Sequence, residues 1–255
     1  MRGYCLGSPP LMRSPLSLLP PLVHRVRRLD FDVCVLDAAE MSLLRTIVLN
    51  ALHADSPITD LTLRLRCRNH ETAQGLGGLG RDLGIQSMRN PPTQPRQVRM
   101  DLQDNVLLAV TIEPLWHGLI TLPEVQGLRF RVDGSCVGDA LRYQHQPTMR
   151  GLRWLHLGVS STQLTSRAFR HICRTSLNLP RLHTLRVDAA HNELADDVLP
   201  DGPGDPGWTP QFPDVLRAAV FDLRDNRFSA GAPAALAGFV DARPVFHFHV
   251  GDAAG

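Results

Sequence analysis

The sequence predicts an α/β solenoid of about eight repeats, in which short parallel strands alternate with helices and loops. A pattern of one apolar residue, two residues of any kind and two apolar residues separated by one recurs at intervals of 25 to 37 residues. Segments with helical periodicity lie between the copies. Because a helix returns the chain after each strand, successive strands must be parallel. One such unit cannot cover its own apolar face, but stacked units can.

The strands are predicted from alternation within each copy, which is typical of a strand with one buried face. The clearest copies are residues 152–157 and 182–187. We take the middle apolar residue of each copy as its marker. The eight markers are Leu29, Leu61, Val98, Leu128, Leu155, Leu185, Phe221 and Phe246.

The helices are predicted from apolar stripes at spacings of three and four residues. They are expected over residues 38–53, 113–122, 165–177 and 229–240. Pro114 is expected near a first helical position, and Ser229 is a candidate N-cap. The glycine-rich run 75–80 lacks the spacing of a dinucleotide-binding loop and is expected to form a weak or broken helix.

The domain organisation follows from these elements. Residues 1–22 are expected to form a tail or a targeting segment, 23–250 the repeat domain, and 251–255 a C-terminal tail. An insert rich in Pro and Gly interrupts the repeats at 200–213. Five dispersed cysteines favour a reducing compartment, so an intracellular, cytoplasmic location is expected. The Arg-rich N-terminus, acid-free before Asp30, leaves a mitochondrial or other organellar location open.

Composition excludes several chemistries. All 27 basic residues are Arg, and a Walker phosphate loop or a pyridoxal Schiff base needs Lys. The cysteines lack zinc-site spacing, and no apolar run reaches the length of a membrane helix. The net charge of +2 does not argue for nucleic acid. Since no catalytic grouping is evident, we expect no enzyme activity, no cofactor and no metal; His247 and His249 share one face but lack a third ligand.

One stretch resembles a known family. Phe221-Asp-Leu223-Arg-Asp-Asn226-Arg-Phe228 is similar to a repeat of the ribonuclease-inhibitor-like leucine-rich-repeat family. The resemblance covers about residues 22–250, and it is strong near 150–240 and loose before 125. It implies parallel strands on a concave face, helices and loops on a convex face, and a side chain at the Asn226 position that hydrogen-bonds the turn backbone. Cys34 is placed at the equivalent position of the first copy. The other copies carry Arg66, Gln103, Asp133, Ser160, Ala190 and Gly251 there, so that Asn105 and Asn192 fall two residues late.

The candidate site is the open face of the sheet. In each copy the residues one and three positions after the marker face away from the core. The candidate partner-binding residues are Arg64, Arg99, Arg129, Arg131, His156, Arg186 and Arg224, with Trp208 of the insert. Arg pairs well with carboxylate and phosphate. The Asp residues of the same face could instead pair internally with these Arg: Asp30, Asp32, Asp101, Asp188 and Asp222.

The predicted function is that of a non-catalytic protein-interaction module or scaffold subunit. The partner is expected to be a protein with an acidic or phosphorylated surface, and not a small-molecule substrate, a membrane or a specific nucleic acid. Two alternatives stay open. One is a structural subunit of a large, possibly organellar, assembly. The other, implied by the family resemblance, is a GTPase-activating-type regulator that acts on a bound partner.

Overall fold

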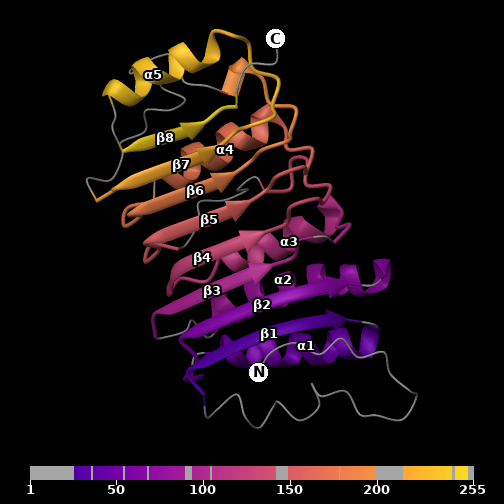
Figure 1. Cartoon of the computed structure of the whole chain (residues 1–255). Coiled ribbons are helices and arrows are strands. Elements are labelled where there is room, and N and C mark those ends of the chain that lie inside the picture. Colours follow the sequence, from indigo (N-terminus) through magenta and orange to yellow (C-terminus); the bar gives the residue numbers. More distant parts are fainter. Residues whose placement is uncertain are drawn as a thin grey trace.

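The computed structural model describes residues 26–35, 37–53, 55–67, 69–89, 94–103, 105–141, 149–177, 179–198, 215–242 and 245–251. One eight-stranded parallel sheet runs through the molecule, with the strands in chain order (Figure 1). The strands are β1 (Arg28–Val35), β2 (Asp60–Cys67), β3 (Arg96–Asp101), β4 (Val125–Arg131), β5 (Trp154–Gly158), β6 (Thr184–Asp188), β7 (Ala218–Asp222) and β8 (Phe246–His249). The predicted parallel α/β repeat architecture is confirmed. The predicted tail 1–22 and insert 200–213 lie outside the described residues.

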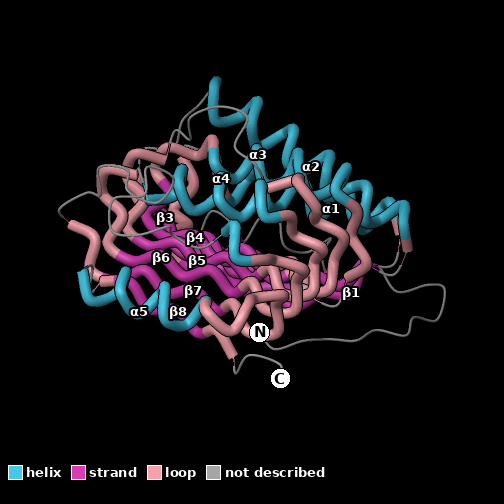
Figure 2. Tube along the Cα trace, turned by 90° about the horizontal axis from the view of Figure 1, so that it is seen from above, coloured by secondary structure: helices cyan, strands magenta, loops and turns pink. Residues whose placement is uncertain are grey.

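Helices α1 to α4 lie together on one side of the sheet (Figure 2). The helices are α1 (Ala38–Ala51), α2 (His70–Arg89), α3 (Ala109–Ile120), α4 (Ser166–Leu177) and α5 (Ala232–Ala242), with a 3-10 helix η3 (Asp196–Val198). Asp37 caps α1 and accepts a hydrogen bond from the Glu40 amide at 2.8 Å. The expected position of Pro114 is wrong, because α3 begins at Ala109 and holds Pro114 inside it. Burial of Ile112 and Leu115 offsets the cost of an internal proline.

Helix α2 is continuous through the glycine-rich run 75–80, so the expected weak or broken helix is wrong. The glycines permit close helix packing. A Cβ atom on Gly80 would lie 2.1 Å from the Pro114 carbonyl oxygen and 2.3 Å from Leu115 Cα. A Cβ atom on Gly118 of α3 would lie 2.1 Å from the Gly80 carbonyl oxygen. Packing of α2 against α3 therefore overrides the low helix propensity of glycine.

The strand register confirms seven of the eight markers. Leu29, Leu61, Val98, Leu128, Leu155, Leu185 and Phe246 lie in one row across the sheet. The marker Phe221 is wrong by two residues, because Ala219 pairs with both Leu185 and Phe246. Both Ala219 and Phe221 are fully buried. The small alanine side chain hides the true start of the apolar pattern in β7.

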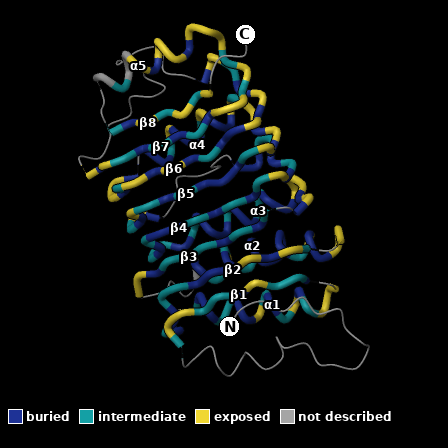
Figure 3. The backbone as a smooth tube through the Cα atoms, viewed as in Figure 1, coloured by how far each residue is buried: buried dark blue, intermediate teal, exposed yellow. Residues whose placement is uncertain are grey.

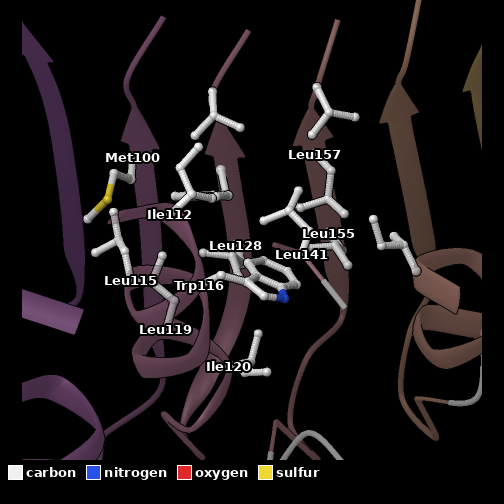
Figure 4. Close-up of a cluster of buried hydrophobic side chains, with 14 of the residues drawn as sticks. Met100, Ile112, Leu115, Trp116, Leu119, Ile120, Leu128, Leu141, Leu155 and Leu157 are labelled. Carbon is white, nitrogen blue, oxygen red and sulfur yellow. The ribbon is translucent and has the colours of Figure 1, made fainter. Parts of the chain in front are cut away.

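The core lies between the sheet and the helices. Trp116 of α3 packs against Phe130 of β4 at a centroid distance of 5.6 Å. Leu128 and Leu155 surround the same indole ring (Figure 4). Figure 3 shows buried residues throughout the strands and exposed residues mainly in the turns and at α5. The continuous core explains how repeats of different length stack into one unit.

A buried arginine joins α1 to β3. Arg96 is 1% exposed, and its guanidinium donates hydrogen bonds at 2.6 Å to the carbonyl oxygens of Ala51 and His53. Burial lowers the pKa of Arg96. These carbonyl groups lie at the C-terminal end of α1, where helix carbonyls have no partner within the helix. Arg96 therefore has a structural role.

The turn after strands β4 to β7 repeats one backbone conformation. Four residues align across these strands: Arg131, Gly158, Asp188 and Asp222. The residue three positions after each of them has a positive φ, between 55° and 78°. These residues are Gly134, Ser161, His191 and Asp225. The next residue in each turn is polar, and these residues are Ser135, Thr162, Asn192 and Asn226. These four repeats therefore share a turn conformation as well as an apolar pattern.

The turn also corrects the predicted asparagine positions. Asn105, Asn192 and Asn226 stand at equivalent places when counted from the strand register. The positions assigned to Cys34, Arg66, Gln103, Asp133, Ser160, Ala190 and Gly251 are wrong, because each lies two residues too early. The error follows from the displaced Phe221 marker.

The turn asparagines bind the backbone of two neighbouring repeats. Asn192 Nδ2 donates to the carbonyl oxygens of Val159 and Ala189 at 2.9 and 3.0 Å. Asn192 Oδ1 accepts from the amides of Thr162 and Leu164 at 3.0 and 2.9 Å. Such a side chain satisfies buried backbone groups that no strand or helix reaches.

Candidate interaction face

The charged face is the side of the sheet away from helices α1 to α4. Its residues form rows across the strands, because aligned residues of neighbouring parallel strands lie about 4.8 Å apart. The central row consists of Asp30, Thr62, Arg99, Arg129, His156, Arg186, Val220 and His247. The next row consists of Asp32, Arg64, Asp101, Arg131, Gly158, Asp188, Asp222 and His249.

Six predicted site residues lie on strands of the charged face: Arg64, Arg99, Arg129, Arg131, His156 and Arg186. The predicted strand position of Arg224 is wrong, because the displaced marker moved it two residues past the end of β7. Arg224 instead binds Asp222, with Nε 2.8 Å from Oδ1 and Nη2 2.7 Å from Oδ2. This hydrogen-bonded pair holds the pKa of Asp222 below its ordinary value. Trp208 lies outside the described residues.

Several arginines of the charged face have carboxylate partners. Arg64 Nη1 lies 3.1 Å from Asp30 Oδ1 on the adjacent strand. Arg131 Nη2 lies 2.9 Å from Asp133 Oδ2, and its Nη1 lies 3.8 Å from Asp101 Oδ2. For these residues the alternative of internal pairing is the one that the geometry supports.

Asp188 holds two basic side chains at once. His156 Nε2 lies 2.7 Å from Asp188 Oδ2, and Arg186 Nε donates to Asp188 Oδ1 at 2.8 Å. Burial of Asp188 by itself raises the carboxyl pKa, but the hydrogen bonds from His156 and Arg186 outweigh burial and lower it. The Asp188 side chain is 16% exposed. The pairing therefore fixes the positions of three charged or polar side chains on β5 and β6.

Arg129 is the exception at the middle of the central row. Among the described residues, no carboxylate forms an ion pair with it, and its Nε atom is buried without a hydrogen-bond partner. Arg99 and His156 flank it on β3 and β5. Arg99 Nη1 itself lies 3.5 Å from Asp60 Oδ1. Arg129 thus carries a positive charge that no carboxylate of the described residues balances in an ion pair.

Two strand glycines let large side chains lie flat on the charged face. A Cβ atom on Gly127 would lie 2.1 Å from Trp154 Cε2 and 2.0 Å from Gln97 Oε1. The Arg99 guanidinium carbon lies 5.7 Å from the centroid of the Trp154 ring. Similarly, a Cβ atom on Gly158 would lie 2.8 Å from Arg131 Cγ. Trp154 is not among the predicted site residues, although strand alternation taken one residue before Leu155 places it on this face.

The helical side of the sheet has a cavity whose lining includes Arg81, Glu113 and His117. This open cavity of about 620 Å³ lies between α2 and α3, with Val110 and Pro114 also in its lining. In the part of the chain that the structure describes, no three His, Cys, Asp or Glu side chains gather as a metal site would require. Within the same residues, no helix has the length and apolarity needed to cross a membrane.

Comparison with known proteins finds similarity among solved structures. No protein-family model matches the chain, and no curated protein matches it. Among solved structures, the chain is similar to internalin C2 from Listeria monocytogenes, with 16% sequence identity and a TM-score of 0.38. That similarity covers 88% of this chain and 80% of internalin C2.

Proposed function

We propose that this chain is a non-catalytic interaction module of the ribonuclease-inhibitor-like leucine-rich-repeat type, which binds a protein partner through the charged face. The observation that carries the proposal is Arg129, which has no carboxylate partner among the described residues and lies at the centre of a sheet face that none of the described helices covers. Its neighbours in the row, Arg99 and His156, pair with Asp60 and Asp188, so Arg129 supplies the positive charge that would attract an acidic surface. The parallel sheet supports the proposal because it offers a broad, preformed surface.

The paired charges around Arg129 contribute to selectivity. Exposed ion pairs such as Arg64 with Asp30 contribute about 0 to 1 kcal/mol to stability. Fixed pairs present a defined pattern of charge, which favours complementary partners and opposes like-charged ones. Association with an acidic partner should slow as salt rises, since the Debye length falls to about 8 Å at physiological ionic strength.

In the experiment the full chain first captures its native partner. The capture is then repeated with variants in which one arginine, on the charged face or on the helical side, is replaced by Glu. Arg64→Glu and Arg186→Glu change two exposed arginines of the charged face. Arg174→Glu makes the same charge change on an exposed position of α4 and serves as the control. We expect the two face variants to lose the partner and the control to keep it. Equal retention by all three variants would refute binding through this face.

A further inference from the structure

We propose that Arg129 is the anchor of the interaction and receives one side-chain carboxylate, from an Asp or Glu of the partner. The inference rests on the proposed function and narrows the partner chemistry from an acidic or phosphorylated surface to a carboxylate. It depends on three features of the charged face: the charge balance around Arg129, the state of its guanidinium, and the position of Trp154.

Among the described residues of the two rows, the charge balance leaves one arginine, Arg129, without a carboxylate partner. Asp60 holds Arg99, and Asp188 holds both His156 and Arg186. Arg131 is held by Asp133 and Asp101. Every basic neighbour of Arg129 in the two rows is therefore already engaged. One uncompensated guanidinium matches one monovalent anion.

The guanidinium of Arg129 is partly withdrawn from water. Its Nε atom is buried, and no hydrogen bond joins the guanidinium to another described residue. A partner therefore cannot reach Nε and must contact the two Nη atoms. A carboxylate accepts two parallel hydrogen bonds from such a pair, and this geometry is stronger and more specific than a single contact. Burial of the pair in a complex would also exclude water from it and strengthen it.

A phosphate group fits this position less well. A phosphorylated side chain carries a charge of about −1.5 to −2 at neutral pH and needs more than one available cation. Release of Arg99 or Arg186 for this purpose would break its pair with Asp60 or Asp188. The freed carboxylate would then repel the phosphate. A single carboxylate needs no such rearrangement.

Trp154 supplies the apolar side of the site. Its indole lies across Gly127 of the adjacent strand β4. Gly127 precedes Arg129 by two residues on that strand, so both lie on the same face. Arg99 rests over the indole and fixes its orientation. The methylene groups of an Asp or Glu side chain can pack on this ring while the carboxylate reaches Arg129. A flat aromatic surface beside one cation favours a side chain projecting from a folded partner.

The test is a titration of the full chain, labelled with ¹⁵N, by three tripeptides with blocked N-termini at constant ionic strength. One carries a central Glu between glycines with both ends blocked, one carries phosphoserine in place of Glu, and one is all glycine with a free C-terminal carboxylate. The readouts are the NMR signals of the Arg129 Nε–H and the Trp154 indole N–H. We expect the Glu peptide to shift both signals saturably and to bind about tenfold more tightly than either other peptide.

Three variants complete the test. Arg129→Gln should abolish the shift of the Trp154 signal, whereas Arg174→Gln, which makes the same change at an exposed position of α4, should leave it unchanged. Thermal unfolding of each variant checks the fold, and Arg129→Lys keeps the charge with a single donor group and should bind the Glu peptide more weakly. Tighter binding of phosphoserine, equal binding of the terminal carboxylate, or an unchanged response in Arg129→Gln would each overturn the inference.

The outcomes separate this inference from the proposed function. If the captured partner is lost from Arg64→Glu and Arg186→Glu but kept by Arg129→Gln, the charged face binds the partner and the anchor assignment is wrong. If all three variants keep the partner, the proposed function itself fails.

Discussion

Asn192 Oδ1 accepts a hydrogen bond from the Leu164 backbone amide at 2.9 Å, across the boundary between two neighbouring repeats. Asn226 repeats the relationship one unit later, with its Oδ1 3.1 Å from the Leu194 amide nitrogen. Asn105 does the same for the Cys67 amide at 2.6 Å. The turns are therefore held together by side chains that belong to the following repeat.

Replacement of Asn192 by Ala should destabilise the fold by about 3 kcal/mol, because it leaves several buried backbone groups without partners. Asn226→Ala should cost less, since Asn226 is partly exposed and water can replace its hydrogen bonds. The measurement is the free energy of unfolding in urea for both variants. An unchanged free energy in Asn192→Ala would contradict the role given to this residue.

The sequence predicted the strands better than the turns. Alternation of apolar residues located every strand, because each strand buries one face against a continuous core. The turn asparagines could not be placed, since β7 begins its buried row with Ala219 and Phe221 was read as the equivalent of Leu185. The register of two neighbouring strands depends on backbone contacts between repeats. One sequence does not reveal these contacts when the spacing between the strand markers varies.

The glycines of α2 give opposite predictions within one helix. Gly84→Ala should stabilise the protein by about 0.5–1 kcal/mol, because a Cβ atom there meets nothing within 4 Å and alanine favours the helix. Gly80→Ala should destabilise it by about 2 kcal/mol or more, since the new Cβ atom overlaps the backbone of α3. Differential scanning calorimetry compares the two. A stabilising Gly80→Ala would show that α2 and α3 are not in close contact there.

The marker row makes a sharper prediction at Leu155, which is 1% exposed on β5. Leu155→Asp places an unpaired carboxylate in the core and should unfold the chain, at a cost of about 4 kcal/mol or more. Leu155→Met conserves volume and should cost less than about 1.5 kcal/mol. Circular dichroism during heating distinguishes the two. A cooperative transition at the wild-type temperature in Leu155→Asp would refute the strand register.

Asp188 predicts a dependence of stability on pH. Its pKa is lowered in the folded state, so its stabilising contribution is present above the unfolded-state pKa of about 3.9 and is lost as pH falls through the folded-state value. Asp188→Asn should cost about 2 kcal/mol at pH 7. The difference between wild type and variant in urea unfolding should shrink as the pH is lowered below about 4. A difference that stays constant over this range would exclude the pairing with His156 and Arg186 as its source.

The charged face could be predicted in outline but not in its pairing. Strand alternation correctly placed Arg99, Arg129 and Arg131 on one face. It could not tell that Arg131 is engaged and Arg129 is not, because pairing depends on side-chain reach across strands. Gly158 allows Arg131 to lie flat toward Asp133, and this effect appears only when the strands are aligned.

The central claim is that Arg129 binds the partner, whereas its paired neighbours stabilise the charged face. Comparison of two charge-reversal variants tests this claim most directly. Melting temperature and partner retention are measured on Arg129→Glu and on Arg131→Glu. Arg131→Glu places a third acid beside Asp101 and Asp133 and should lower stability by about 2 kcal/mol. Arg129→Glu should keep the wild-type melting temperature and lose the partner. An Arg129→Glu protein that keeps both its melting temperature and its partner would contradict the account.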